Sequence, residues 1–145
     1  MNATETSSPS SAWTHWYQRA LPAYWIFLFF TTHLPNLRLG GPVRWSDKLM
    51  HIGAFAVLAF LFWRFAETVR RPLSGRFIWI AFLWLMAYAA FDEYTQRFAG
   101  RGLELADFLC DLVGIGLVLI ALEWRRRRLP AARHDSPLDS TPHES

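Results

Sequence analysis

Three short stretches of the sequence place polar or ionisable residues four positions apart. Four residues make about one turn of a helix, so the two members of each pair lie on the same helical face. Carboxylates arranged in this way can hold a hard divalent cation, and a nearby histidine can act as a general acid or base. The three pairs are Asp47 with His51, Asp92 with Gln96, and Asp107 with Asp111.

Basic residues beside these pairs have the chemistry to hold an anion such as a phosphate. Lys48 directly follows Asp47, and Arg101 lies between the second and third pairs. Hydrogen bonds from Lys and Arg to phosphate oxygens are charge-assisted and therefore strong. The candidate ligand-binding residues are Lys48, Gln96 and Arg101.

The acidic residues support two further assignments, although no motif among them identifies a nucleophile. The candidate catalytic residues, which would exchange protons or polarise a substrate, are Asp47, His51, Asp92, Glu93 and Asp107. The candidate ligands of a divalent cation are Asp92, Glu93, Asp107 and Asp111. These residue types fit phosphoryl chemistry, and they leave open whether the chain is an enzyme.

The segments that must position these residues are strongly hydrophobic. The 145-residue chain is 52% hydrophobic and 17% aromatic. Such a composition in a short chain is typical of a membrane protein. Apolar stretches predict transmembrane helices at residues 20–34, 47–66, 77–97 and 107–124. The predicted fold is therefore all-α: a polytopic bundle of four transmembrane helices over residues 17–128, joined by short connections.

The two ends of the chain lack the apolar content of its middle. Residues 1–16 and 129–145 are rich in Ser, Thr and Pro. Such segments bury too little apolar surface to offset the entropy lost on ordering. Both are therefore predicted to be flexible tails.

Charge and cysteine content narrow the functional classes. The net charge is +3, but the arginines flank hydrophobic segments and form no soluble basic face, so no nucleic-acid partner is predicted. The single Cys110 excludes an internal disulfide and a multi-cysteine metal site. The partner expected in this setting is a membrane lipid or a lipid-linked envelope precursor, and the oligomeric state is left open.

The distribution of basic residues predicts the orientation of the bundle. Four spans place both chain ends on the same side as the connection between the second and third spans. Cytoplasmic segments of membrane proteins carry an excess of Lys and Arg. That side holds most of the 15 Lys and Arg residues, namely Arg19, Arg64, Arg70, Arg71, Arg76, Arg125, Arg126, Arg127, Arg128 and Arg133. Both termini are therefore predicted to be cytoplasmic, with the polar pairs at the outer ends of their helices.

Asp92 and Asp111 are the hardest of the acidic residues to explain by local structure. Each lies within a predicted span, where a lone carboxylate costs about 2.5–3.5 kcal/mol even on the most lenient insertion scale. Both are therefore predicted to face the interior of the bundle and to have a partner there. The partners that the sequence offers are Lys48, His51 and Arg101.

The other polar residues also have structural explanations. Asp47 and Asp107 fall in the first turns of their predicted helices, where the helix dipole favours an anion. His51 can make an ordinary hydrogen bond in the core. Glu93 and Arg97 are four apart and can form a surface ion pair of little energetic value. Under this interpretation the charges form a buried ion network that fixes the register of the helices.

The same stretches are similar to a known protein family. The sequence resembles the VanZ-like family of small membrane proteins through DKLMHIGAF, DEYTQRF, a following GR and DFLCDLVG, over about residues 20–124. The matching residues are Asp47, Lys48, His51, Asp92, Glu93, Gln96, Arg101, Asp107 and Gly114. The sequence departs from the pattern at Asp111, where family members commonly have Asn, and this second carboxylate makes the pocket more acidic.

The resemblance implies a multi-pass protein of the bacterial cytoplasmic membrane that acts in the cell envelope or in the response to glycopeptide antibiotics of the teicoplanin type. Its outward-facing polar pocket would bind or process an envelope lipid or a lipid-linked precursor. A divalent cation is the cofactor that the acidic residues suggest. The alternative is a non-enzymatic protein whose ion network is structural or supports assembly with a partner.

Overall fold

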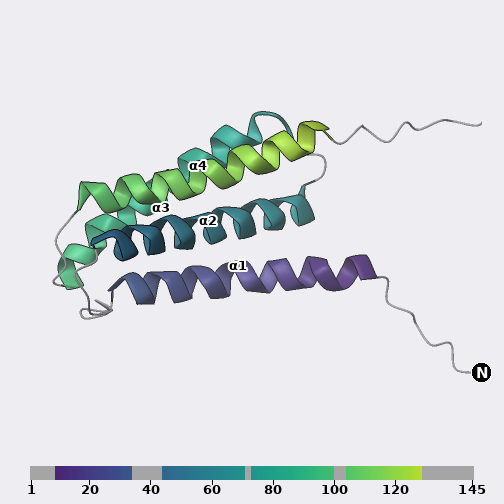
Figure 1. The fold of residues 1–145 in the computed structure, drawn as a ribbon. Coiled ribbons are helices and arrows are strands. Elements are labelled where there is room, and N and C mark those ends of the chain that lie inside the picture. The colour runs from purple at the N-terminus through teal and green to yellow at the C-terminus, as the bar shows by residue number, and fades with distance from the viewer. Residues whose placement is uncertain (1–8, 34–43, 71–72, 100–103, 129–145) are drawn as a thin grey trace, which may run out of the picture.

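The described parts of the chain form antiparallel helices that lie side by side. The computed structural model describes residues 9–33, 44–70, 73–99 and 104–128. Its elements, in order, are α1 (Pro9–His33), α2 (Arg44–Val69), α3 (Phe77–Gln96), the 3-10 helix η1 (Arg97–Ala99) and α4 (Leu105–Arg128). The four long helices form one elongated bundle (Figure 1). The predicted all-α architecture is confirmed for the described residues.

Three of these helices are long and apolar enough to cross a membrane, at Ser46–Val69, Phe77–Ala99 and Leu105–Arg128. The sequence locates each of them but gives shorter spans, at residues 47–66, 77–97 and 107–124. The helices extend past these apolar cores because crossing the hydrocarbon takes about 20 residues, more than some of the cores supply. Large exposed side chains on them are apolar, among them Trp79, Leu83, Leu117 and Ile120.

The N-terminal helix begins earlier than the sequence predicts. A flexible tail is expected over residues 1–16, whereas α1 begins at Pro9, so the second half of that segment is helical. Proline is favoured in the first turn of a helix, where its missing N–H is not needed. No glycine or second proline interrupts the chain before Pro22. That α1 crosses the membrane stays a prediction. The remaining parts of the predicted tails, residues 1–8 and 129–145, lie outside the described residues.

Helix α1 packs against the bundle through a mixed aliphatic and aromatic face. Leu21 and Leu28 are buried in the hydrophobic core. Tyr24 Oη donates a hydrogen bond to the backbone oxygen of Ala54 in α2, at 2.9 Å. These contacts hold α1 alongside α2 for much of its length (Figure 1).

The hydrophobic core lies between the helices and brings α2 and α4 closest together. Its largest fully buried apolar side chains are Trp63, Phe55, Leu58, Leu85, Ile115 and Leu119. Gly114 of α4 faces the backbone of Ile52 in α2, and no side chain fits between them. This close approach sets the spacing at which polar residues on the two helices meet.

The two ends of the bundle differ in chemistry. At one end, called here the cluster end, α1 finishes at His33 and α4 begins at Leu105. At the other, called the arginine end, α2 finishes at Val69 and α4 finishes at Arg128. The basic residues in the last turn of α4 all lie at the arginine end. The acidic residues that the sequence singles out lie at the cluster end.

A buried carboxylate ties the arginine end together. Glu123 of α4 is 5% exposed and accepts two hydrogen bonds from Arg126, each 2.7 Å long. The same guanidinium donates a third hydrogen bond to the backbone oxygen of Leu73, at 3.2 Å. Arg126 thereby joins the end of α4 to the connection between α2 and α3.

Candidate functional site

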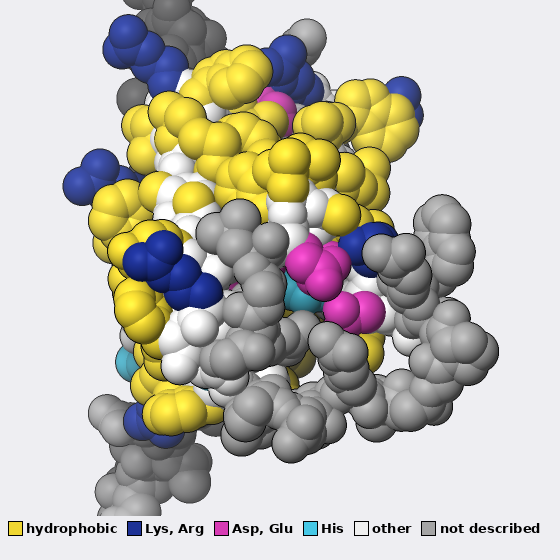
Figure 2. Space-filling view, turned by 90° about the vertical axis from the view of Figure 1, so that its left-hand side faces the viewer, with side chains coloured by type: hydrophobic (Ala, Val, Ile, Leu, Met, Phe, Trp, Pro, Cys, Tyr) yellow, Lys and Arg dark blue, Asp and Glu magenta, His cyan; other side chains and the backbone are white. Residues whose placement is uncertain are grey.

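Polar side chains of α2, α3 and α4 gather at the cluster end. Figure 2 looks onto this end and shows acidic side chains beside a histidine and a basic residue, with hydrophobic side chains around them. The buried members of the group are His51, Asp92, Glu93, Gln96, Asp107 and Asp111. Residues from three separate stretches of the sequence therefore converge on one region.

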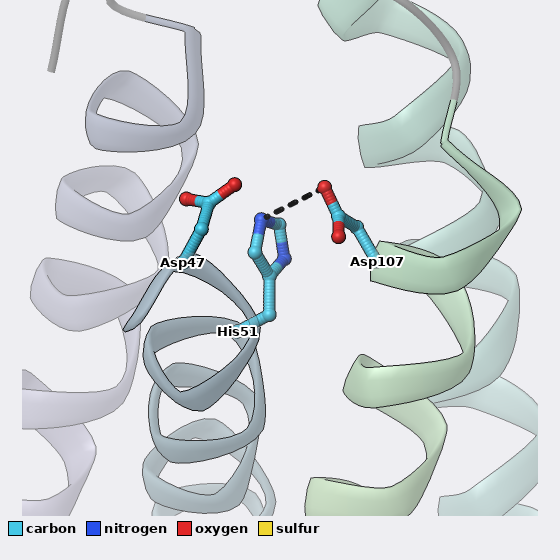
Figure 3. A group of neighbouring side chains, drawn as sticks. All are labelled: Asp47, His51 and Asp107. Carbon is cyan, nitrogen blue, oxygen red and sulfur yellow. Dashed lines mark ion pairs between the residues drawn. The ribbon is translucent and has the colours of Figure 1, made fainter. Parts of the chain in front are cut away.

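His51 lies at the centre of this group, between two carboxylates of α4. Its Nδ1 atom is 2.9 Å from Asp111 Oδ1, within hydrogen-bond distance. Its Nε2 atom is 3.8 Å from Asp107 Oδ2, which is an ion-pair contact longer than a hydrogen bond (Figure 3). Because Asp107 and Asp111 are one helical turn apart, they face the two nitrogens of the same ring.

Lys48 and Asp47 complete the α2 side of the group. Lys48 Nζ donates a hydrogen bond to Asp107 Oδ1 at 2.8 Å, which neutralises a carboxylate that is almost fully buried. Asp47 is exposed and lies on the opposite side of the His51 ring from Asp107 (Figure 3). Lys48 is thus the partner of Asp107, whereas the sequence offers it as a partner of Asp92 or Asp111.

Asp92 is held by residues of α3 and α1. Gln96 Nε2 donates to Asp92 Oδ2 at 2.9 Å, which is the contact that their four-residue spacing allows. Thr32 Oγ1 of α1 donates to the other oxygen, Oδ1, at 3.1 Å. His33 Nδ1 lies 3.9 Å from the same oxygen. Both carboxylate oxygens of this fully buried residue are therefore satisfied within the bundle.

The residues that α1 contributes to this cluster, Thr32 and His33, are not among the site residues predicted from the sequence. Thr32 and His33 belong to the polar TTH motif at the end of the first predicted span. The predicted topology puts this motif on the same face of the membrane as the three polar pairs. That coincidence is the signal by which the two residues could have been found.

Glu93 points into the bundle and not toward Arg97. Its side chain is buried, and one carboxylate oxygen accepts a hydrogen bond from the backbone N–H of Glu104 at 3.3 Å. The Arg97 guanidinium donates to the Tyr94 hydroxyl and lies 3.9 Å from the centre of its ring. The expected surface pair of Glu93 with Arg97 does not form among the described residues. Arg101, the remaining predicted ligand-binding residue, lies outside them.

Two groups of side chains at this end have the spacing of metal ligands. Asp47, His51 and Asp107 form one group, and His51, Glu93 and Asp111 form the other. Within each group the ligand atoms lie within 4.8 Å of one another. Asp92, which the sequence includes among the metal ligands, belongs to neither described group. Its two oxygens accept hydrogen bonds from Gln96 and Thr32.

Comparison with known proteins adds one informative relative. Over 89 residues the chain is 34% identical to an uncharacterized membrane protein, YwnJ, of Bacillus subtilis (strain 168). The aligned part covers 60% of this chain and 57% of that protein. Three of the chain's helices have membrane-spanning length, and its relative is a membrane protein. The chain is therefore a small multi-pass membrane protein. No protein-family model and no solved structure matches the chain.

Proposed function

We propose that this chain binds or processes an envelope lipid, or a lipid-linked envelope precursor, in the polar pocket at its cluster end. In this proposal it is a VanZ-like protein of the bacterial cytoplasmic membrane that acts in the cell envelope or in the response to teicoplanin-type antibiotics. The observation that carries the proposal is the buried group of His51 and four carboxylates, with the partly exposed Lys48 paired to one of them, at one end of a membrane bundle. Intramembrane ionisable groups are costly and mark functional sites by default.

An apolar pocket beside the cluster supports a lipid as the ligand. It has a volume of about 380 Å³ and is open to the surface of the bundle. Its lining residues are Pro22, Trp25, Ile26, Phe29, Phe30 and Tyr88. Phe29 stacks on His33 at 4.1 Å, and Tyr88 is one turn from Asp92, so the pocket adjoins the polar cluster. A lipid needs this pairing of an apolar groove for its chain with polar groups for its head.

The proposed orientation has four spans, with both termini in the cytoplasm. The arginine end carries the basic last turn of α4, as the positive-inside rule requires of a cytoplasmic face. The fourth span is α1, whose contacts with Ala54 of α2 and Asp92 of α3 hold it alongside these helices. The polar pocket then faces outward, toward the leaflet in which lipid-linked envelope precursors are used.

The proposal is tested by substituting two carboxylates with their isosteric amides. Asp92→Asn and Glu93→Gln should abolish protection of a susceptible bacterium against a teicoplanin-type antibiotic while the protein still accumulates in the membrane. Glu104→Gln is the matched control, because Glu104 is an exposed acid at the same end of the bundle. Native mass spectrometry of the purified protein with a polyprenyl phosphate should show binding that both variants weaken. Full protection and full lipid binding by both variants would contradict the proposal.

One observation favours a second function, a structural ion network. Lys48 with Asp107, His51 with Asp111 and Gln96 with Asp92 form polar contacts within the bundle. Such a network fixes the register of helices, or supports assembly with a partner, without any ligand. This interpretation predicts that Asp92→Asn and Glu93→Gln fail to accumulate in the membrane, whereas the lipid-binding interpretation predicts normal accumulation.

A further inference from the structure

We infer that His51, Glu93 and Asp111 together bind one divalent transition-metal cation. The three residues come from α2, α3 and α4, and each offers one ligand atom within 4.8 Å of the other two. All three are buried, at 6%, 4% and 0% exposure. Because three different helices supply the ligands, the packing of the bundle holds them in place before any ion arrives.

An unsatisfied oxygen of Asp111 points to a missing partner at this position. Asp111 Oδ1 lies next to His51 Nδ1, but Asp111 Oδ2 is buried without a hydrogen-bond partner among the described residues. A buried carboxylate oxygen without a partner costs more than a neutral polar group in the same position. A cation bound at this oxygen would remove that cost.

The local charge also favours a cation. The carboxylates of Glu93 and Asp111 lie close together in the interior, where like charges repel strongly. The single lysine of the sequence, Lys48, already donates a hydrogen bond to Asp107 at 2.8 Å. Two carboxylates and a neutral imidazole balance the charge of one dication. Among the described residues, no Lys or Arg side chain forms an ion pair with Glu93 or Asp111.

The neighbouring group of Asp47, His51 and Asp107 is a weaker site. Lys48 occupies one oxygen of Asp107, and its positive charge would repel a second cation there. Asp47 is exposed, whereas all three ligands of the inferred site are buried. Asp107 has a different role in the inferred site. It faces the Nε2 atom of His51, the nitrogen away from Asp111, as carboxylates beyond the ligand shell do in many histidine–metal sites.

The ligand types select the class of ion. One imidazole nitrogen and two carboxylate oxygens suit Zn²⁺ or Mn²⁺. Mg²⁺ and Ca²⁺ prefer ligand sets made of oxygen alone. Three protein ligands also leave coordination positions free for a phosphate oxygen of a lipid or lipid-linked precursor. This role of the ion rests on the proposed function, whereas the presence of the ion does not.

The test measures bound metal directly in the full chain. The protein is purified in detergent, stripped with a chelator, and dialysed against Zn²⁺, Mn²⁺ or Mg²⁺. Mass spectrometry of the metal content should give about one Zn²⁺ or Mn²⁺ per chain and no tightly bound Mg²⁺. Asp111→Asn should lower the affinity for Zn²⁺ at least tenfold, because it removes a charged ligand while keeping the shape of the side chain.

A matched substitution controls for general damage to the pocket. Glu104→Gln also removes one carboxylate charge at the same end, from an exposed residue outside the ligand group, and should bind Zn²⁺ like the wild type. The inference fails if the wild type binds no metal, or if Asp111→Asn binds it unchanged. Loss of metal binding in Asp47→Asn together with retention in Glu93→Gln would assign the ion to the other group and also overturn the inference.

The inference and the proposed function can fail separately. Binding of the polyprenyl phosphate by chelator-treated protein, with no metal bound at any concentration tested, would reject the cation and keep the lipid. Stoichiometric Zn²⁺ that Asp111→Asn removes, with no lipid binding in either state, would reject the proposed function and keep the cation.

Discussion

Gly114 of α4 lies so close to α2 that a side-chain carbon added to it would be 2.2 Å from the carbonyl oxygen of Ile52. No pair of non-bonded atoms tolerates that distance. Ile52 directly follows His51, and Gly114 lies one turn after Asp111. The close approach of the two backbones is therefore what brings His51 within 2.9 Å of Asp111.

Replacing Gly114 with alanine should push α2 and α4 apart. We expect Gly114→Ala to lower the free energy of unfolding by about 1–3 kcal/mol, the usual cost of overpacking a core. Gly116→Ala is the matched control, because a side chain at that position meets no atom within 4 Å. Unfolding of both variants in detergent, followed by circular dichroism, measures the difference. Equal stability of the two variants would contradict the close contact.

The ion pair of Lys48 with Asp107 should be visible as a coupling between the two residues. Lys48→Met leaves a nearly buried carboxylate without its partner, so we expect it to destabilise the protein more than the double variant Lys48→Met/Asp107→Asn does. A double-mutant cycle on the free energy of unfolding should give a coupling of about 1–3 kcal/mol. Arg97→Met serves as the control, since Arg97 contacts Tyr94 and no carboxylate among the described residues. If the changes in unfolding free energy caused by the two single substitutions simply add in the double variant, the ion pair contributes nothing to stability.

Substitutions at two adjacent threonines of α1 can distinguish the energy of its contact with α3 from the energy of hydrogen bonds within α1. The Thr32 hydroxyl reaches two acceptors, Asp92 of α3 and the backbone oxygen of Phe29 in its own helix. The Thr31 hydroxyl donates to the backbone oxygen of Leu28 in α1. Thr32→Val should therefore cost about 1–3 kcal/mol in unfolding free energy, because it leaves an oxygen of a buried carboxylate unsatisfied. Thr31→Val makes the same change of shape and should cost clearly less. A larger cost for Thr31→Val than for Thr32→Val would contradict the contact of Thr32 with Asp92.

Cysteine labelling tests the orientation of the bundle and the number of spans. In a Cys110→Ala background, Glu104→Cys at the cluster end should react with a membrane-impermeant maleimide in intact cells. Ser74→Cys and Trp13→Cys, both exposed at the arginine end, should react only after permeabilisation. Labelling of Ser74→Cys from outside would invert the orientation. Labelling of Trp13→Cys alone from outside would show that α1 does not cross the membrane.

Helical periodicity and composition were enough to predict the helices and the polar faces along them. Apolar stretches of nearly membrane length predict α2, α3 and α4, because a backbone in lipid must satisfy its hydrogen bonds internally. Spacing of four residues places Asp107 and Asp111 on one face of α4 whatever surrounds it. Charge inside such segments also predicts that Asp92 and Asp111 face the interior, as the structure has them. These properties depend only on residues close together in the chain.

The partners across helices depend on tertiary packing, and for that reason the sequence left them undetermined. Spacing along one helix does not state how that helix is rotated, or how far it is shifted, against its neighbours. The contact of Gly114 with Ile52 settles both for α2 and α4 and pairs His51 with Asp111. The position of α1 assigns Thr32 to Asp92, a pairing between residues 60 positions apart that no local pattern encodes. The rotation, shift and distance between helices are properties of the packed bundle, and they decide which of the buried charges meet.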